Sequence, residues 1–279
     1  MISAPRAVTH VHAIGYRGDH HLTVPETVAT EEPLEIRVAG PGQEATPAVV
    51  TMRTPGHDFE LAAGFLVTEG LSGAHEVAAV AYCDGARPEH RFNTVTVSLR
   101  RAWDPSSTRR DFMATSACGV CGKSSIDHVE LSCPVVVPGP PIAASLITDL
   151  PDRLRAGQRV FDSTGGLHAA GLFDIEGELS CLREDVGRHN AVDKIVGNRV
   201  LTHRTLPASG GAVLMVSGRV SFEIVQKAAM AGVGVLAAVS APSSLAVTAA
   251  DRLGLTIAGF VRNGRYNVYT HPERIDLDR

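Results

Sequence analysis

The second half of the chain alternates short apolar runs with amphipathic segments, and this alternation limits the possible folds more than any other feature. Apolar runs at residues 212–216, 233–239 and 255–261 predict strands, and residues 221–231 and 243–253 between them have helical periodicity. The middle run lacks polar alternation, which is typical of a parallel strand covered by helices on both faces. The pattern therefore predicts a βαβαβ unit within an α/β fold.

Polar segments follow all three predicted strands at the points where the strands end. They are Ser217-Gly218-Arg219, residues 240–244, and Arg262-Asn263-Gly264-Arg265. Taken by itself, Ser217-Gly218-Arg219 is typical of a tight turn. Taken by itself, Arg262-Asn263-Gly264-Arg265 is typical of an Asn-Gly hairpin that leads into residues 266–269. Ligands of parallel sheets bind outside the carboxyl ends of the strands, and glycine, arginine and a helix N-terminus all suit phosphate. Together the segments predict a clamp for a pyrophosphate or nucleotide.

The first half of the chain has an α+β pattern of short strands around one helix. The expected elements are strands at residues 34–38 and 48–52, which form a hairpin across Gly40-Pro41-Gly42, a helix at residues 58–69, and strands at residues 77–82 and 94–99. A linker at residues 135–141 then leads to a helix at residues 143–155. We therefore expect an unassigned tail at residues 1–24, a smaller strand-rich part at residues 25–140 and the α/β part at residues 141–279.

Cys118-Gly119-Val120-Cys121 places two thiols three residues apart in a segment without helix or strand pattern. A thiolate is both a soft metal ligand and a nucleophile, so a thiol pair on a loop indicates metal binding or sulfur handling. The other three cysteines, Cys83, Cys133 and Cys181, are predicted to be small buried hydrophobes. An odd cysteine count and the lack of a signal peptide or membrane span predict a cytoplasmic protein without a disulfide framework.

Three chemistries remain open for the cysteine pair, and we rank a mobile sulfur loop first, zinc second and a dithiol oxidoreductase third. Zinc needs two further ligands, and His128 is the only spaced candidate. Zinc deaminases also have proline before the first cysteine of the pair, where this chain has Ala117. A net charge of -4 gives no general attraction to nucleic acid or to an anionic membrane.

Residues 164–168 and 183–190 are rich in polar residues and glycine. Asp185 suits the cap of a helix whose buried face includes Ala191 and Ile195, so Glu184 and Lys194 are interpreted as surface charges. His168 and His189 adjoin glycine-bearing turns of the kind that line clefts. They are therefore candidate cleft residues, together with Gly165 and Gly166.

Several of these motifs, in this order, resemble the formate dehydrogenase accessory sulfurtransferases of the FdhD family. The resemblance covers about residues 34–275 and is carried by Arg53-Thr54-Pro55-Gly56, Cys118-Gly119-Val120-Cys121-Gly122, residues 161–170, residues 184–190, Ser217-Gly218-Arg219 and residues 260–265. It implies a cytidine-deaminase-like fold, often as a homodimer. The lack of a complete zinc ligand set then fits a deaminase scaffold put to another use, without a permanent metal.

The resemblance also implies a function. A member of this family takes persulfide sulfur from a cysteine desulfurase and passes it to the molybdenum cofactor before that cofactor enters the catalytic subunit of formate dehydrogenase. By position, Cys118 matches the persulfide cysteine and Cys121 its loop partner. The bound substrate is molybdenum bis(molybdopterin guanine dinucleotide), and residues 260–265 match the segment that holds it. The candidate cofactor-binding residues are Phe260, Val261, Arg262, Asn263, Gly264, Arg265, Ser217, Gly218, Arg219, Gly165, Gly166, His168 and His189.

Two functions of other classes stay open at this point. One is a zinc-dependent deaminase or hydrolase with Cys118, Cys121 and His128 as ligands. The other is a chaperone that binds the cofactor and a partner protein without chemistry of its own.

Overall fold

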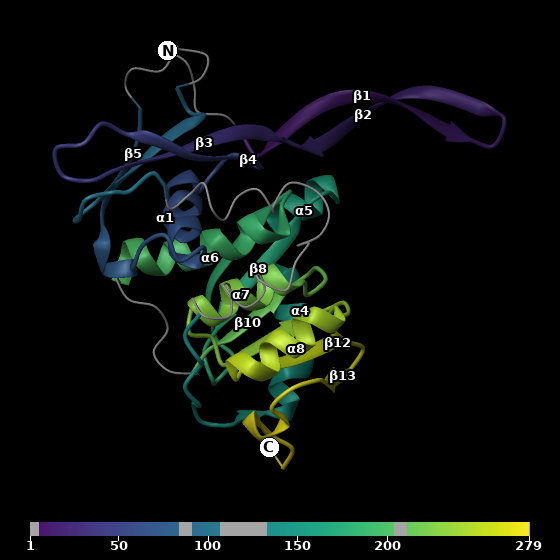
Figure 1. The fold of residues 1–279 in the computed structure, drawn as a ribbon. Helices are drawn as coiled ribbons and strands as arrows, with labels where there is room; N and C mark the ends of the chain where they lie inside the picture. The colour runs from purple at the N-terminus through teal and green to yellow at the C-terminus, as the bar shows by residue number, and fades with distance from the viewer. Residues whose placement is uncertain (1–5, 84–90, 107–132, 204–210, 279) are drawn as a thin grey trace.

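The structure, a computed structural model, describes residues 6–83, 91–106, 133–203 and 211–278. Its largest sheet has six strands in the order β13-β12-β11-β10-β8-β9 (Figure 1). The strands are β8 (His168–Phe173), β9 (Leu179–Asp185), β10 (Val213–Val216), β11 (Val235–Ala238), β12 (Thr256–Arg262) and β13 (Arg265–Val268). Strands β10, β11 and β12 are parallel, which confirms the predicted βαβαβ unit, whereas β8, β9 and β13 add antiparallel pairs.

Helices cover both faces of this sheet because its central strands are apolar on both faces. The helices are α4 (Ala144–Gly157), α6 (Arg188–His203), α7 (Phe222–Met230) and α8 (Ser244–Leu253). Leu214 and Leu236 belong to the core shared with α6, α7 and α8. Their neighbours Val213 and Val235 pack instead with Leu150 of α4, as the alternation of side chains along a strand requires. The sheet therefore lies between α4 and the other three helices.

A second sheet in the N-terminal part has the strand order β4-β3-β6-β5. Its elements are β3 (Glu32–Ala39), β4 (Thr46–Arg53), β5 (Val77–Tyr82) and β6 (Thr94–Leu99), with α1 (Asp58–Thr68) and the short η1 (Ala74–Glu76) between β4 and β5. Strands β3 and β4 form the predicted hairpin, and β5 and β6 have the predicted bounds. Strand β3 is parallel to β6.

Helices α1 and α6 join the two parts through a glycine contact. A Cβ atom on Gly64 of α1 would collide with the carbonyl oxygen of Asp193, and one on Gly197 of α6 would collide with that of Glu60. The helix backbones approach this closely only because both positions lack a side chain. One continuous apolar cluster consequently runs from the second sheet through this contact to the main sheet.

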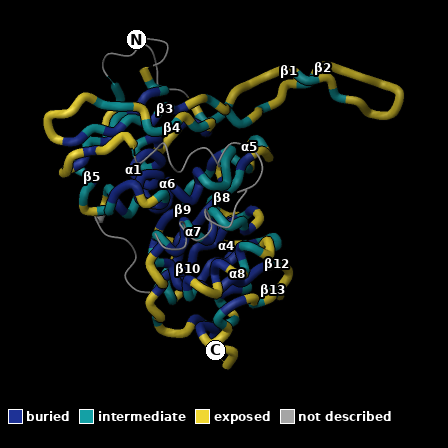
Figure 2. Tube along the Cα trace, in the orientation of Figure 1, coloured by how far each residue is buried: buried dark blue, intermediate teal, exposed yellow. Residues whose placement is uncertain are grey.

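The first two strands form a ribbon that extends away from the rest of the molecule (Figure 1). Strands β1 (Val8–Arg17) and β2 (His20–Ala29) pair antiparallel along their whole length across a two-residue turn, in which Gly18 has a positive φ of 60°. Most of the ribbon is exposed (Figure 2). No element was predicted for residues 1–24, and β2 continues across the expected boundary at residue 25.

Short elements complete the described chain. Helix α5 (Arg159–Thr164) follows α4, β7 (Ile142–Ala143) pairs in parallel with β14 (Ile275–Asp276), and η4 (Pro272–Arg274) precedes β14. In the part of the chain that the structure describes, no helix is both long enough and apolar enough to cross a membrane.

Candidate functional site

The site forms where β10 ends beside the start of β8. Since these strands are antiparallel, Ser217 after β10 lies next to Ala169. The Ser217 amide donates to the Ala169 carbonyl at 3.0 Å, and the Ala169 amide donates to the Ser217 Oγ at 2.9 Å. These two bonds fix the turn after β10 against β8 and bring the predicted residues Ser217 and His168 to one sheet edge.

Gly218 lies against two side chains of this edge. A Cβ atom at this position would be 3.3 Å from His168 Nδ1 and 3.6 Å from Arg188 Cδ, so a side chain would crowd the imidazole. Burial lowers the pKa of His168, and the positive charges of Arg188 and Arg219 lower it further. The His168 ring is therefore neutral near pH 7, with a donor and an acceptor for a ligand.

His189, at the start of α6, is the second histidine near this edge. Its Nε2 atom is 3.3 Å from the Ser221 Oγ and 3.8 Å from a Glu223 carboxylate oxygen. Burial, followed by the charges of Arg188 and Lys227, lowers the pKa of His189 to about 4. This ring is likewise neutral near pH 7, and its contact with Ser221 ties the start of α6 to that of α7.

The turns after β10 and β11 are bonded to each other. The Val220 amide donates to the Ala241 carbonyl at 3.1 Å, and the Ser243 amide donates to the Val220 carbonyl at 3.0 Å. Phe260 joins this edge from β12, because its amide donates to the Ser240 carbonyl at 3.1 Å. Phe260 has a positive φ of 55°, at the irregularity that interrupts the pairing of β12 with β13. The three predicted segments thus lie along one edge, as the βαβαβ pattern indicated.

The turn between β12 and β13 presents two arginines to solvent. Asn263 and Gly264 both have positive φ values, and Arg262 pairs with Arg265 across the turn. The Arg262 guanidinium lies 5.6 Å from the centre of the Phe260 ring, whereas Val261 is buried beneath the turn. The exposed guanidinium groups are available to an anionic ligand, and Val261 contributes to the core.

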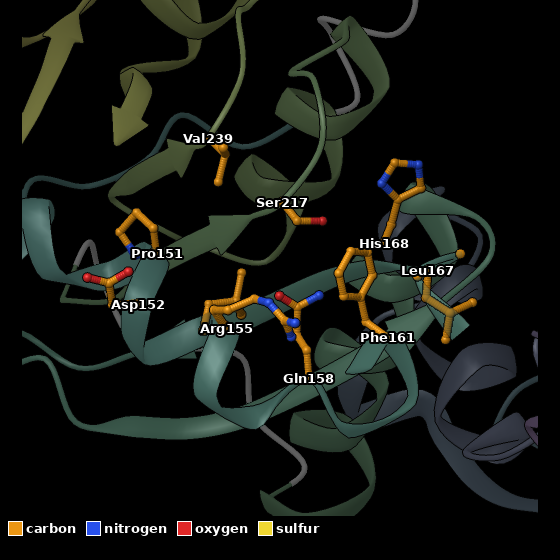
Figure 3. A pocket seen from close by; sticks show the side chains of 12 residues that line it. Pro151, Asp152, Arg155, Gln158, Phe161, Leu167, His168, Ser217 and Val239 are labelled. Carbon is orange, nitrogen blue, oxygen red and sulfur yellow. The ribbon is translucent and has the colours of Figure 1, made fainter. Parts of the chain in front are cut away.

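A pocket of about 660 Å³ opens beside the edge formed by Ser217 and His168 (Figure 3). Gly165, Gly166, His168 and Ser217 line it, so the structure brings four of the predicted residues together. The remaining lining residues were not predicted and are Pro151, Asp152, Leu154, Arg155, Gln158, Phe161, Leu167 and Val239. The pocket therefore combines an apolar wall with one carboxylate, one guanidinium and an amide.

The unpredicted part of the pocket comes from α4 and α5. Asp152 and Arg155 are three residues apart on α4, and Arg155 lies over the Phe161 ring at 4.7 Å. Residues 143–155 were predicted as a helix, and their spacing indicates that these two side chains share a face. The sequence therefore indicated that Asp152 and Arg155 share a helix face, but only the fold shows that this face borders the strand ends.

The interpretation of Glu184 as a surface charge is wrong. Its carboxylate accepts the amide protons of Val160 at 3.0 Å and Phe161 at 2.7 Å, at the first turn of α5. A helix start has amides without partners in the helix, and a carboxylate satisfies them. Glu184 therefore holds α5, and with it Phe161, against the sheet edge.

The same interpretation is wrong for Lys194, which is 1% exposed. Its Nζ atom forms an ion pair with the Asp185 carboxylate at 2.6 Å and donates to the Thr54 carbonyl at 2.9 Å. Asp185, the last residue of β9, also accepts the amide protons of Gly187 at 2.8 Å and Thr54 at 3.2 Å. This buried pair fixes the turn that leads to His189 and connects it to the N-terminal part.

The cysteine predictions have mixed outcomes. Cys133 and Cys181 are buried as predicted, whereas Cys83 is half-buried with its Sγ 3.0 Å from the Thr96 Oγ1. Cys118, Cys121 and His128 lie outside the described residues. Among the described residues, no group of three or more histidine, cysteine, aspartate or glutamate side chains is arranged to hold a metal ion.

The described residues provide the parts of a site for an anionic ligand with a flat or apolar group. The glycine-bearing turns bring backbone close to the pocket, two neutral histidines offer hydrogen bonds, and Arg219, Arg262 and Arg265 are exposed cations along the same edge. Such an arrangement binds and orients a ligand.

Comparison with known proteins gives concordant matches. The model of the FdhD/NarQ family matches residues 29–276. The chain is 53% identical over 263 residues to a sulfur carrier protein FdhD of Streptomyces avermitilis, which covers 91% of each chain. It is 49% identical over 284 residues to the sulfur carrier protein FdhD of Mycobacterium bovis, which covers 98% of each.

A solved structure is also similar. A crystal structure from Desulfotalea psychrophila, described provisionally as a formate dehydrogenase accessory protein, superposes with a TM-score of 0.74 at 25% identity. The match covers 97% of this chain and 100% of that one. The similarity therefore extends over both sheets and is not limited to one motif.

Proposed function

Because the chain belongs to the FdhD/NarQ family, we propose that it is a sulfur carrier that supports the maturation of formate dehydrogenase. The single observation that carries the cofactor part of the proposal is the convergence of Ser217, Gly218 and His168 with the Gly165-Gly166 turn around one pocket. Relatives of about 50% identity named as sulfur carriers support the sulfur part.

In this proposal Cys118 is the sulfur acceptor. Its thiolate attacks the terminal sulfur of a persulfide on a cysteine desulfurase, an S–S bond forms on Cys118, and the thiolate of the desulfurase leaves. No oxidant is needed, because the sulfane sulfur only changes its carrier. Once the cofactor is bound, attack of the Cys121 thiolate on the inner sulfur of Cys118 would release hydrosulfide at the cofactor and leave a disulfide that a thiol reductant must reopen.

The cofactor, molybdenum bis(molybdopterin guanine dinucleotide), is the substrate to which the sulfur is delivered. We place its nucleotide end at the edge formed by the ends of β10, β11 and β12. Arg262 and Arg265 are suited to its phosphates, and the pocket beside His168 is large enough for a flat ring. Binding at the nucleotide end leaves the metal end free to meet the sulfur on Cys118.

The same family membership leads us to propose that the main sheet is a deaminase scaffold without the deaminase zinc site. The parallel β10-β11-β12 unit with helices on both faces supports this proposal. A stoichiometric zinc ion on the purified protein would contradict it and would favour a zinc-dependent hydrolase.

Complementation in cells tests the proposed function. In a strain that lacks the chromosomal copy of this protein, Cys118→Ala is expected to abolish formate dehydrogenase activity. Cys83→Ala is the matched control, because it removes a half-buried thiol hydrogen-bonded to Thr96 and should retain activity. Full activity with Cys118→Ala would contradict the carrier and favour a chaperone without sulfur chemistry.

A further inference from the structure

Gln158 has a buried side-chain amide without a hydrogen-bond partner. The residue is 4% exposed, and among the described residues no group forms a hydrogen bond with its side chain. Burying an amide without a partner costs free energy, because the amide loses its hydrogen bonds to water. Gln158 lines the pocket of about 660 Å³, and its amide points into that pocket between Arg155 and Phe161 (Figure 3). The unpaired amide is therefore directed at the ligand that occupies the pocket.

The backbone holds Gln158 in this position from both sides. Its N–H group donates to the Arg155 carbonyl at 3.2 Å, at the end of α4, and its carbonyl accepts the amide proton of Asp162 at 3.0 Å, in α5. Glu184 in turn holds the first turn of α5 against the sheet edge. A polar group that is fixed in advance loses little conformational entropy when a ligand binds.

Arg155 determines which ligand atoms can lie beside Gln158. Its guanidinium lies over the Phe161 ring at 4.7 Å and forms an ion pair with Asp162 at 2.5 Å. A guanidinium has only donors, so the ligand atom beside it has to be an acceptor. The Gln158 amide carries a donor and an acceptor side by side and can pair with two neighbouring polar atoms of a ring. The two side chains together fit a ring carbonyl next to a ring N–H, which is a lactam edge.

We propose that Gln158 is a specificity-determining residue that binds the lactam edge of the ring in the pocket. This inference rests on the proposed function, since the ring belongs to the cofactor, whose guanine and pterin groups both have a lactam edge. Adenine has an amino group where guanine has the carbonyl, and the amino protons would face the Arg155 guanidinium. A ring that leaves polar groups of a site unpaired is strongly rejected by that site.

Calorimetric titration of the full-length protein with GDP, ADP and neopterin tests the proposal. The wild type is expected to bind GDP more tightly than ADP, by about tenfold or more. Gln158→Met, which keeps the approximate size of the side chain, should lower the affinity for GDP about tenfold, because two hydrogen bonds are lost, and should leave that for ADP unchanged. An unchanged ratio of the two affinities in Gln158→Met would overturn the proposal.

The melting temperature of the free protein separates recognition from a structural role. Because the Gln158 amide has no partner to lose, Gln158→Met should leave the melting temperature unchanged or raise it. Gln43→Met is the matched control, because the Gln43 amide is bonded to Gly40 and Trp103 in the N-terminal part. It should lower the melting temperature and keep the preference for GDP. A lower melting temperature of Gln158→Met would give its amide a structural role and would likewise overturn the proposal.

The choice of ligands separates this proposal from the placement of the nucleotide end. Neopterin has the lactam edge but no phosphate. If neopterin binds and Gln158→Met weakens it, while GDP does not bind, the lactam recognition is supported and the nucleotide placement is wrong. If GDP binds and Gln158→Met keeps its preference over ADP, the nucleotide placement is supported and the role of Gln158 is wrong. Binding of neither ring to the wild type would overturn both.

Discussion

At the scale of single residues, the buried ion pair of Lys194 and Asp185 fixes the turn that leads to His189. Both side chains are almost inaccessible, and their charges satisfy each other at 2.6 Å. Lys194→Met removes one charge and leaves the other buried without its partner. We expect the free energy of unfolding to fall by about 3–5 kcal/mol, measured by urea denaturation.

Arg37→Met is the control for that change. The Arg37–Glu35 pair is partly exposed, so its loss should lower the free energy of unfolding by about 1 kcal/mol or less. Equal effects of the two substitutions would contradict the structural role of the buried pair.

His189 gives the stability a defined pH dependence. Its pKa in the folded protein is about 4, below the ordinary value of 6.5, so the unfolded chain binds the proton first as the pH falls. Stability is therefore retained above pH 6.5 and decreases between pH 6.5 and 4, by at most about 1.4 kcal/mol per pH unit for this residue. Water at the partly exposed ring makes the slope smaller. His189→Gln should reduce the slope in urea melts over this range, and an unchanged slope would contradict the assignment.

At the scale of elements, the sequence predicted those whose pattern is local. Strands β5 and β6 agree with their predicted bounds, and the apolar runs of residues 212–216 and 233–239 lie in the parallel sheet as expected. Strands β8 and β9 were missed, because glycine and histidine in the first and charges at the end of the second obscure the alternation. The ribbon was missed because its strands are exposed on both faces and carry few core residues.

The positions of the candidate site residues could be predicted only in part. The strand-end segments lie at one edge, as the βαβαβ pattern predicted. Glu184 was misjudged because its partner, the start of α5, lies 24 residues away in sequence, and Lys194 because one of its partners, the Thr54 carbonyl, lies 140 residues away. The charge of a residue and its place on a helix do not indicate such partners. Only the folded chain brings them together.

The crossing of α1 and α6 depends on two glycines. Gly197→Ala would place a methyl group on the Glu60 carbonyl, which is backbone and has no room to move. We expect a loss of about 3 kcal/mol or more in the free energy of unfolding, despite the better helix propensity of alanine. Gly157→Ala is the control, since its methyl group would meet only a Leu182 methyl, and the change should stay within about 1 kcal/mol. A stabilised Gly197→Ala protein would contradict this packing.

The turn between β12 and β13 is the element proposed to hold the phosphates of the cofactor. Arg262→Ala and Arg265→Ala should each lower the affinity for GDP, used as a probe of the nucleotide end, by about tenfold, because each removes a charge-assisted hydrogen bond. Isothermal titration calorimetry measures the affinity. Arg37→Ala, on β3, is the control and should bind as the wild type does. Unchanged affinity in both turn variants would remove this turn from the binding site.

At the scale of the whole molecule, the proposed function separates the edge that binds the cofactor from the thiols that carry the sulfur. Burial raises the pKa of the Cys133 and Cys181 thiols to about 11, so both stay protonated and unreactive near pH 7. The Cys83 thiol is hydrogen-bonded to Thr96. These environments agree with the proposal that Cys118 and Cys121 transfer the sulfur and that the sheet edge around Ser217 binds the cofactor.

The most direct test of this account is the intact mass of the protein after incubation with a cysteine desulfurase, cysteine and pyridoxal phosphate. The wild type should gain one sulfur, about 32 Da, which dithiothreitol removes by thiol exchange. Cys121→Ala and Cys83→Ala should gain the same mass, and Cys118→Ala should gain none. Added sulfur on Cys118→Ala, or none on the wild type, would contradict the assignment of Cys118 as the sulfur carrier.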